Sequence, residues 1–242
     1  PKDQNPVSQH DTMGDVEPKI DDKNFLVKFS FGEFVFPVTT LRPETIFGVT
    51  NIWANPNVVY KKVLVDNETW IVSEECAHKI EFFEKQVKVI GDISGKDLVG
   101  KTAVSPTNGN EVPILPAEFV EPGMGTGLVM SVPAHAPKDY QALMDLKAKN
   151  DNLASKIEPI PIIITEGYDM YPAKQICEKL GVSDQTDSKL EEATKELYLK
   201  EFTDGKLNEK CGDFNGEKVQ FGRDKIRAWL QENKHLEKFP VL

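Results

Sequence analysis

TTLRPETIFG, residues 39–48, is one of two stretches that decide the fold of this chain, and the other is GTGLVMSVPAHAPKDY, residues 125–140. The first places three threonines, an arginine and a glutamate where a strand is expected to pass into a helix. The second runs an apolar strand into a helix that begins at Pro137 and carries Asp139 in its first turn. Strand-to-helix junctions often carry functional side chains. The two stretches therefore predict a small polar pocket, rather than a metal site or a triphosphate loop.

Short strands are expected on both sides of these stretches. FLVKFSF (25–31) and EFVFPVTT (33–40) are typical of two strands joined by a tight turn at Gly32, and Pro37 suits an edge or a bulge. Further strands are predicted at 58–65, 69–72, 87–90, 103–104, 112–115, 128–132 and 160–164. This pattern, interrupted by a few helices, predicts an α/β fold with a distorted β-barrel core surrounded by helices.

Helices are expected at 73–83, 137–149, 172–180, 188–202 and 222–233. Ser73 is predicted to cap the first of these, and Gly181 to end the third. The chain therefore divides into a polar lead-in at 1–24, a β core at 25–171 and a helical extension at 172–242. The polar start at Pro1, without a methionine, suggests a fragment of a longer protein.

The composition is that of an ordinary folded domain, with 39% hydrophobic and 28% charged residues. No apolar run approaches the roughly 20 residues that a membrane-spanning helix needs. The net charge of −10 disfavours extensive binding to a nucleic-acid duplex, although contact with one single-stranded end stays possible. The cysteines are few and widely spaced, which favours a reducing, cytoplasmic setting over a disulfide framework or a zinc site.

Several of the polar residues have structural alternatives. The threonines of the first stretch are also common strand formers and helix caps. His135 is an isolated motif histidine, and structural roles are commoner for such residues than general-base catalysis. Asp139 could compensate the helix dipole or pair with a substrate ammonium group. Gly125 and Gly127 lack the lysine and spacing of a phosphate loop, and they are expected to permit close backbone approach.

The two stretches together resemble the editing domain of leucyl-tRNA synthetase in its archaeal and eukaryotic cytosolic form. TTLRPETIFGVTN is similar to the threonine-rich motif of that family, and GTGLVMSVPAHAPKDYQAL to its second motif. Residues 5–18 resemble the family's entry into the domain, and the tail from Pro172 resembles its helical extension. The editing domain of the valyl enzyme is the alternative. Leu41, inserted before Arg42, and Ala136, where the valyl pattern carries an aspartate, favour the leucyl enzyme.

The resemblance implies hydrolysis of the aminoacyl ester of tRNA(Leu) mischarged with isoleucine, valine, norvaline or methionine, with leucine excluded. The implied partners are the 3′-terminal aminoacyl-adenosine of tRNA(Leu) and the remainder of a parent synthetase, with no membrane and with a monomeric fragment. No cofactor is implied for editing, whereas the parent enzyme would use ATP and magnesium. The chain lacks the signatures of ATP chemistry, so no aminoacylation is expected. A non-catalytic module that binds the tRNA acceptor end remains a second interpretation.

The resemblance also implies roles for individual residues. The implied catalytic residues are Thr39, Thr40, Thr45 and Asp139, and the implied substrate-binding residues are Leu41, Arg42, Met130, Ser131, Val132 and His135, with no metal ligand.

Within this set, Asp139 would bind the substrate ammonium group, and Thr45 would shape the pocket that blocks leucine. Thr39 and Thr40 would position water and stabilise the oxyanion. Arg42 would hold its own loop or approach the terminal phosphate, and His135 would support the pocket from behind.

Overall fold

The computed structural model describes residues 25–81 and 86–238, and the first two strands form as the sequence predicts. β1 (Phe25–Phe31) and β2 (Phe34–Thr40) pair antiparallel over their full length. Gly32 turns the chain between them with φ at +59°, a conformation that glycine adopts without steric cost. The hairpin delivers Thr39 and Thr40 to the end of β2.

The remaining strands are short, as the sequence predicts. They are β3 (Asn51–Ala54), β4 (Val59–Val65), β5 (Glu68–Val72), β6 (Val87–Ser94), β7 (Thr102–Val104), β8 (Glu111–Pro116), β9 (Leu128–Ser131), β10 (Ile163–Ile164), β11 (Lys206–Leu207) and β12 (Leu236–Lys238).

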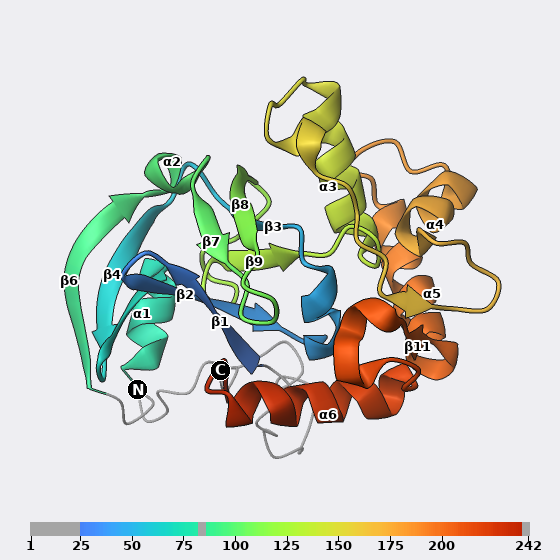
Figure 1. The fold of residues 1–242 in the computed structure, drawn as a ribbon. Helices are drawn as coiled ribbons and strands as arrows, with labels where there is room; N and C mark the ends of the chain where they lie inside the picture. Colours follow the sequence, from blue (N-terminus) through green and yellow to red (C-terminus); the bar gives the residue numbers. More distant parts are fainter. Residues whose placement is uncertain (1–24, 82–85, 239–242) are drawn as a thin grey trace, which may run out of the picture.

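Within the described residues, β1 to β9 and β12 form one mixed sheet of ten strands in the order β6-β4-β5-β2-β1-β7-β8-β3-β9, with β12 added against β1. β2 with β5 and β3 with β8 are parallel pairs, and the other pairs of this sheet are antiparallel. The α/β fold, with helices around a large sheet, is confirmed (Figure 1). In the described part of the chain the end strands β6 and β9 are not paired with each other, so no closed barrel forms.

Pro37 lies inside β2, which has neighbours on both sides in the strand order. The predicted edge position of Pro37 therefore holds only at Pro37 itself, where β2 has no paired residue on the β5 side. β2 pairs with β5 at Val35 alone, whereas Pro37 faces Lys28 of β1. The missing N–H of proline therefore interrupts no ladder with β5.

The helices follow the predicted segments closely. They are η1 (Pro43–Gly48), α1 (Glu74–Ile80), α2 (Gly95–Leu98), α3 (Pro137–Ala148), η2 (Ala154–Lys156), α4 (Pro172–Leu180), α5 (Lys189–Asp204), η3 (Glu209–Phe214) and α6 (Val219–Glu232). Ser73 caps α1 by accepting the N–H of Cys76, and Gly181 ends α4 in the left-handed conformation, both as predicted. α2 and the three 3-10 helices are too short to show a helical repeat of apolar residues in the sequence.

The strand predicted at 160–164 is mostly wrong, because only Ile163–Ile164 pairs as β10. The backbone N–H of Ile162 instead donates to the Nε2 atom of His135 at 2.8 Å. An apolar run alone does not reveal that its backbone donors are taken by a side chain far away in the sequence.

The helices after Pro172 pack onto the sheet rather than standing apart from it. Figure 1 shows α6 running beneath β1 and β2, while α3, α4 and α5 gather on one side. Ile226 and Leu230 of α6 share one hydrophobic core with Phe25 of β1 and Ile46 of η1. β12 then adds to β1 through register pairs at Phe25–Val27. The core of residues 25–171 is therefore completed by the segment that follows it.

Candidate functional site

A cavity of about 610 Å³ lies where the two motif stretches meet. Its volume falls within the range typical of small-molecule sites. The walls come from the end of β2, η1, β9, the start of α3 and one face of α5. The lining residues are Thr39, Thr40, Leu41, Arg42, Thr45, Lys79, Phe119, Val120, Glu121, Met124, Gly125, Val129, Met130, Val132, Ala136, Lys138, Asp139, Thr194 and Tyr198.

The threonine-rich turn is organised around the backbone of Arg42. The Oγ1 atom of Thr40 accepts the N–H of Arg42 at 3.0 Å, and the Oγ1 atom of Thr45 donates to the carbonyl of Arg42 at 2.8 Å. Pro43 begins η1, where its missing N–H costs nothing. Thr45 is 1% exposed and Thr40 is 8% exposed. The turn thus fixes both hydroxyl groups while keeping these residues against the cavity.

Gly125 closes the cavity beside Thr39, as the predicted need for close backbone approach requires. Its φ is +58°, and a Cβ atom there would lie 2.1 Å from the Oγ1 atom of Thr39. Gly127, with φ of +75°, likewise leaves no room for a Cβ atom beside Ser73. Both glycines therefore serve packing rather than phosphate binding.

Asp139 presents a buried carboxylate to the cavity from the first turn of α3. Its Oδ1 atom accepts the indole N–H of Trp53 at 2.9 Å, and its Oδ2 atom accepts the backbone N–H of Val132 at 2.9 Å. Burial raises the pKa of Asp139 to about 6, although both hydrogen bonds and the nearby Lys138 oppose that rise. Among the described residues, Asp139 forms no ion pair, so it lacks a directly bound cation.

Arg42 is committed to the protein interior. Its Nε atom donates to Glu44 at 2.9 Å, its Nη2 atom donates to Glu201 at 2.8 Å, and its guanidinium lies 4.3 Å from the ring centre of Tyr198. Burial opposes the charge, but attraction to Glu201 and Glu44 outweighs it and raises the pKa of Arg42. This geometry favours the loop-holding role over contact with a terminal phosphate.

His135 is fully buried behind the cavity, and its hydrogen bonds define its tautomer. The backbone N–H of Ile162 can only donate, so the Nε2 atom of His135 is the acceptor. The Nδ1 atom then carries the proton and donates to Glu201 at 2.6 Å. Because both ring nitrogens are occupied, His135 supports the structure and is not placed to act as a general base.

Glu201 joins the two motif stretches from α5. It is fully buried and binds both Arg42 and His135. Burial opposes its ionisation, but His135 and Arg42 outweigh burial and lower the pKa of Glu201. One carboxylate thus ties the threonine-rich turn to the turn that precedes α3.

The structure brings most of the residues expected from the sequence into one cavity. They are Thr39, Thr40, Leu41, Arg42, Thr45, Met130, Val132 and Asp139. Ser131 and His135 do not line it. Ser131 is fully buried and stands opposite Asn51 of β3 in the sheet.

Sequence reasoning missed the residues that support this cavity from other elements. They are Trp53, Thr194, Tyr198 and Glu201. Glu201 carries a detectable signal, because Leu190, Ala193 and Leu197 precede it at helical spacing on the buried face of α5. A carboxylate on such a face predicts a buried partner. Trp53 carries no comparable signal, since a buried strand residue needs no polar role.

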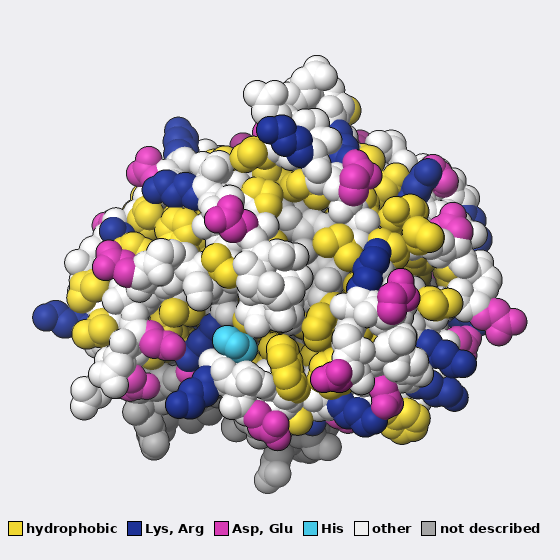
Figure 2. Space-filling view, viewed as in Figure 1, with side chains coloured by type: hydrophobic (Ala, Val, Ile, Leu, Met, Phe, Trp, Pro, Cys, Tyr) yellow, Lys and Arg dark blue, Asp and Glu magenta, His cyan; other side chains and the backbone are white. Residues whose placement is uncertain are grey.

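The charge on the surface is mixed. On the face shown in Figure 2, lysines and arginines alternate with acidic residues instead of forming a continuous basic stripe. The cavity lining is mixed as well, because Lys79 and Lys138 contribute positive charge and Glu121 contributes negative charge. Within residues 25–81 and 86–238, no group of three His, Cys, Asp or Glu side chains could hold a metal ion, and no helix is both long and apolar enough to cross a membrane.

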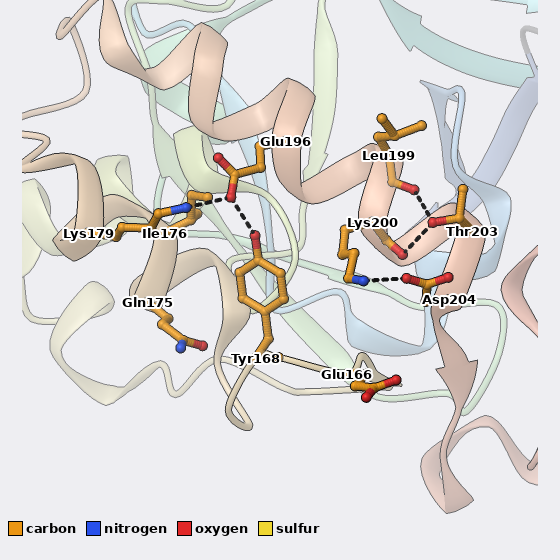
Figure 3. Close-up of a pocket in the computed structure, with 11 residues that line it drawn as sticks. Glu166, Tyr168, Gln175, Ile176, Lys179, Glu196, Leu199, Lys200, Thr203 and Asp204 are labelled. Carbon is orange, nitrogen blue, oxygen red and sulfur yellow. Dashed lines mark hydrogen bonds and ion pairs between the residues drawn. The ribbon is translucent and has the colours of Figure 1, made fainter.

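A second cavity, of about 670 Å³, lies between α4, α5 and the loop at 166–168. Figure 3 shows Lys179 and Tyr168 both directed at Glu196, with Lys200 beside Asp204 on the same helix. Its lysines are thus already paired with acids that also line the cavity. None of the residues expected to be functional lines this cavity.

Comparison with known proteins shows the family. The profile described as "Leucyl-tRNA synthetase, editing domain" matches residues 24–157, more than half of the chain. The chain belongs to the leucyl-tRNA synthetase editing-domain family. It is 47% identical over 230 residues to the leucine–tRNA ligase of Methanothrix thermoacetophila, covering 93% of this chain and 24% of that protein. It is 43% identical over 242 residues to that of Methanocaldococcus jannaschii, covering 93% and 25%.

Solved structures of leucyl editing domains share the fold. The crystal structure of GlLeuRS-CP1 superposes with a TM-score of 0.80 at 25% identity, covering 90% of this chain and 99% of that one. The P. knowlesi cytosolic leucyl-tRNA synthetase editing domain gives 0.81 at 18% identity, covering 90% and 96%. The chain spans about a quarter of the length of the curated ligases it matches. The family match favours the leucyl over the valyl interpretation.

Proposed function

We propose that this leucyl editing domain hydrolyses the aminoacyl ester of mischarged tRNA(Leu) and spares leucyl-tRNA(Leu). The observation that carries the proposal is Asp139, a buried carboxylate that has no ion-pair partner among the described residues and that faces a cavity also lined by Thr39, Thr40 and Thr45. Such a site suits a ligand that brings its own cation beside a reactive ester. The α-ammonium group of an aminoacyl-adenosine satisfies both conditions.

Asp139 is the proposed anchor for the ammonium group. Its two hydrogen bonds leave lone pairs on both oxygens, because each oxygen accepts one N–H. A bound ammonium group would form charge-assisted hydrogen bonds and relieve the cost of the buried charge. With the ammonium group held, the ester carbonyl is fixed relative to the attacking water.

Thr45, Met130 and Val132 form the proposed side-chain pocket. All three line the cavity, and each is less than 10% exposed. The Thr45 hydroxyl already donates its hydrogen bond to the Arg42 carbonyl, so the orientation of the Thr45 side chain is fixed. A rigid side chain can reject leucine while accepting a differently branched competitor, as a second sieve must.

Thr39 and Thr40 are the proposed groups that position water and stabilise the oxyanion. The Oγ1 atom of Thr40 accepts the Arg42 N–H, which leaves its hydroxyl proton available to a ligand. Thr39 packs against Gly125, which also lines the cavity. The ester is already activated, so orientation and hydrogen bonding supply the catalysis without a nucleophilic triad or a metal.

The proposed partner is the 3′-terminal aminoacyl-adenosine of tRNA(Leu), presented by the remainder of a longer ligase in the cytoplasm. Lys79 and Lys138 at the cavity support contact with a phosphate despite the net charge of −10. Leu41, which is 55% exposed at the cavity, is available for an apolar contact with the bound nucleoside. ATP and magnesium are assigned to the synthetic site of the longer enzyme and not to this cavity.

Hydrolysis of isoleucyl-tRNA(Leu) at high enzyme concentration tests the proposal. We expect the chain to deacylate this ester, and Asp139→Ala to lower kcat/KM about 100-fold or more, as loss of one partner of a buried charge pair does. Asp145→Ala is the matched control. Asp145 also lies on α3, but it accepts hydrogen bonds from Gln141 and Gln185 and does not line the cavity. Tight tRNA binding without hydrolysis would instead support the non-catalytic binding module.

A further inference from the structure

Trp53 lies directly behind the carboxylate of Asp139. It stands on β3, is fully buried, and donates its indole N–H to the Oδ1 atom of Asp139 at 2.9 Å. This is the only hydrogen bond that Asp139 receives from a side chain within the described residues. The other oxygen is held by the backbone of Val132.

The position of the indole is fixed by packing on every side. In the sheet, Trp53 stands opposite Leu115 of β8 and Val129 of β9, so its strand is paired at both edges. Its ring meets Phe119 edge to face, with 5.7 Å between ring centres. It also belongs to the hydrophobic cluster that seats Leu143 of α3 on the sheet. A donor held this firmly restricts the rotation of the carboxylate that it binds.

The other charged groups around Asp139 cannot replace this donor. Lys138, on the same helix, lies 4.9 Å from the ring centre of Phe119, and Lys79, from α1, donates to the Gly123 carbonyl. Arg42, at η1, is bound by Glu44 and Glu201. Tyr198, on α5, is a neutral neighbour, because burial raises its pKa to about 12.

We propose that Trp53 is a positioning residue of the editing site, whose indole N–H orients the Asp139 carboxylate toward the substrate ammonium group and keeps it ionised. The assignment rests on the proposed function of the cavity. A hydrogen bond donated to a carboxylate stabilises its charged form, and a buried carboxylate depends strongly on each such bond. Because Asp139 has two of these bonds from the described residues, losing one changes both its orientation and its protonation.

Trp53→Phe removes the N–H and retains an aromatic ring, and the pH dependence of isoleucyl-tRNA(Leu) hydrolysis measures the consequence. We expect the acid limb of kcat/KM to move up by about one pH unit, giving about five-fold lower activity at pH 6 and less than two-fold lower activity above pH 8. Trp70→Phe is the matched control. Trp70 is also buried and also donates its indole N–H to a carboxylate, that of Glu68, but it lies away from the cavity.

Carbon-13 NMR of the Asp139 carboxyl group, assigned by its loss in Asp139→Asn, follows the same change without substrate. We expect Trp53→Phe to raise the pKa of this carboxyl group and Trp70→Phe to leave it unchanged. If Trp53→Phe does not fold, benzothienylalanine at position 53 retains the shape of the indole without its N–H and is measured in its place.

A uniform loss of activity at all pH values, with an unchanged carboxyl titration, would assign Trp53 a packing role and overturn the inference. An inactive wild-type chain would instead overturn the proposed function, while the NMR titration would still report on the Trp53 bond.

Discussion

At the scale of single residues, the site combines a carboxylate that needs a cation with hydroxyl groups that are held still. Asp139 is buried without an ion-pair partner among the described residues, whereas Thr40 and Thr45 are bonded to the backbone of Arg42. The contrast with Arg42 is informative, because that residue is charged, buried and fully partnered. Asp139 is thus a charged group left available to a ligand, and Arg42 maintains the shape of the turn.

The size of Thr45 is expected to decide whether leucine is excluded. Thr45→Ala removes the methyl and hydroxyl groups from the pocket wall, so leucyl-tRNA(Leu) hydrolysis should rise about ten-fold or more, since one small group in such a pocket is worth about 1–3 kcal/mol. Deacylation of purified leucyl-tRNA(Leu) measures the effect. Thr45→Val retains the volume without the hydroxyl, and it should still spare leucine. Continued sparing by Thr45→Ala would place the exclusion elsewhere.

The protonation of Asp139 should set a pH limit on both activity and stability. With the pKa of Asp139 raised by burial to about 6, ammonium binding and hydrolysis should decline as the pH falls below about 6. The folded state holds the proton more tightly than the unfolded chain does, so the contribution of Asp139 to the free energy of unfolding should fall as the pH rises from about 4 to about 6. Urea unfolding of wild type and Asp139→Asn across this range measures the difference. A pH-independent difference would contradict the raised pKa.

At the scale of elements, α5 joins the helical segment to the site. Thr194 and Tyr198 line the cavity, and Glu201, on the next turn, binds Arg42 and His135. The two motif turns do not bond to each other through side chains in the described structure, apart from a 3.4 Å bond from Arg42 to the backbone of His135. Their relative placement therefore depends on a helix from a different part of the chain.

Loss of the Glu201 carboxylate should destabilise the fold severely. Glu201→Ala leaves a buried guanidinium short of one partner, which costs about 3–5 kcal/mol in buried charge networks. Glu196→Ala on the same helix is the control. Its 2.7 Å pair with Lys179 (Figure 3) is solvent-exposed and is expected to contribute less than about 1 kcal/mol. Urea denaturation of both variants provides the comparison. Equal losses would show that burial of the Glu201 network is not what stabilises it.

At the scale of the whole molecule, one hydrophobic core contains residues from both sides of the expected boundary at 171/172. Leu207, Ile226 and Leu230 belong to the same core as Phe25 and Val27. β12 extends the sheet itself by pairing with β1. We therefore propose that 25–171 and 172–242 are regions of one cooperative unit, and that the boundary reflects a change in sequence texture.

Truncation at residue 171 tests this unity. A chain ending there loses the helical side of the shared core, so we expect it to bind a hydrophobic dye and to unfold without a cooperative transition. Thermal unfolding followed by circular dichroism, with the intact chain beside it, gives the answer. A cooperative transition near that of the intact chain would show that 25–171 folds independently.

The sequence by itself determined the local elements and the two motifs. The β1–β2 hairpin, the cap at Ser73, the end of α4 at Gly181 and the helical position of Asp139 all follow from side-chain periodicity and from residues with restricted backbone geometry. These features depend on neighbours a few residues apart, so their signal is local.

Only the tertiary structure decided how the site is held. Glu201 lies 159 positions from Arg42, and Trp53 lies 86 positions from Asp139. Ser131 turned out not to line the cavity, and His135 turned out to be bonded at both nitrogens. Contacts at such separations arise when strands and helices pack, and hydrophobic periodicity reports that a residue is buried without reporting which partner it meets there.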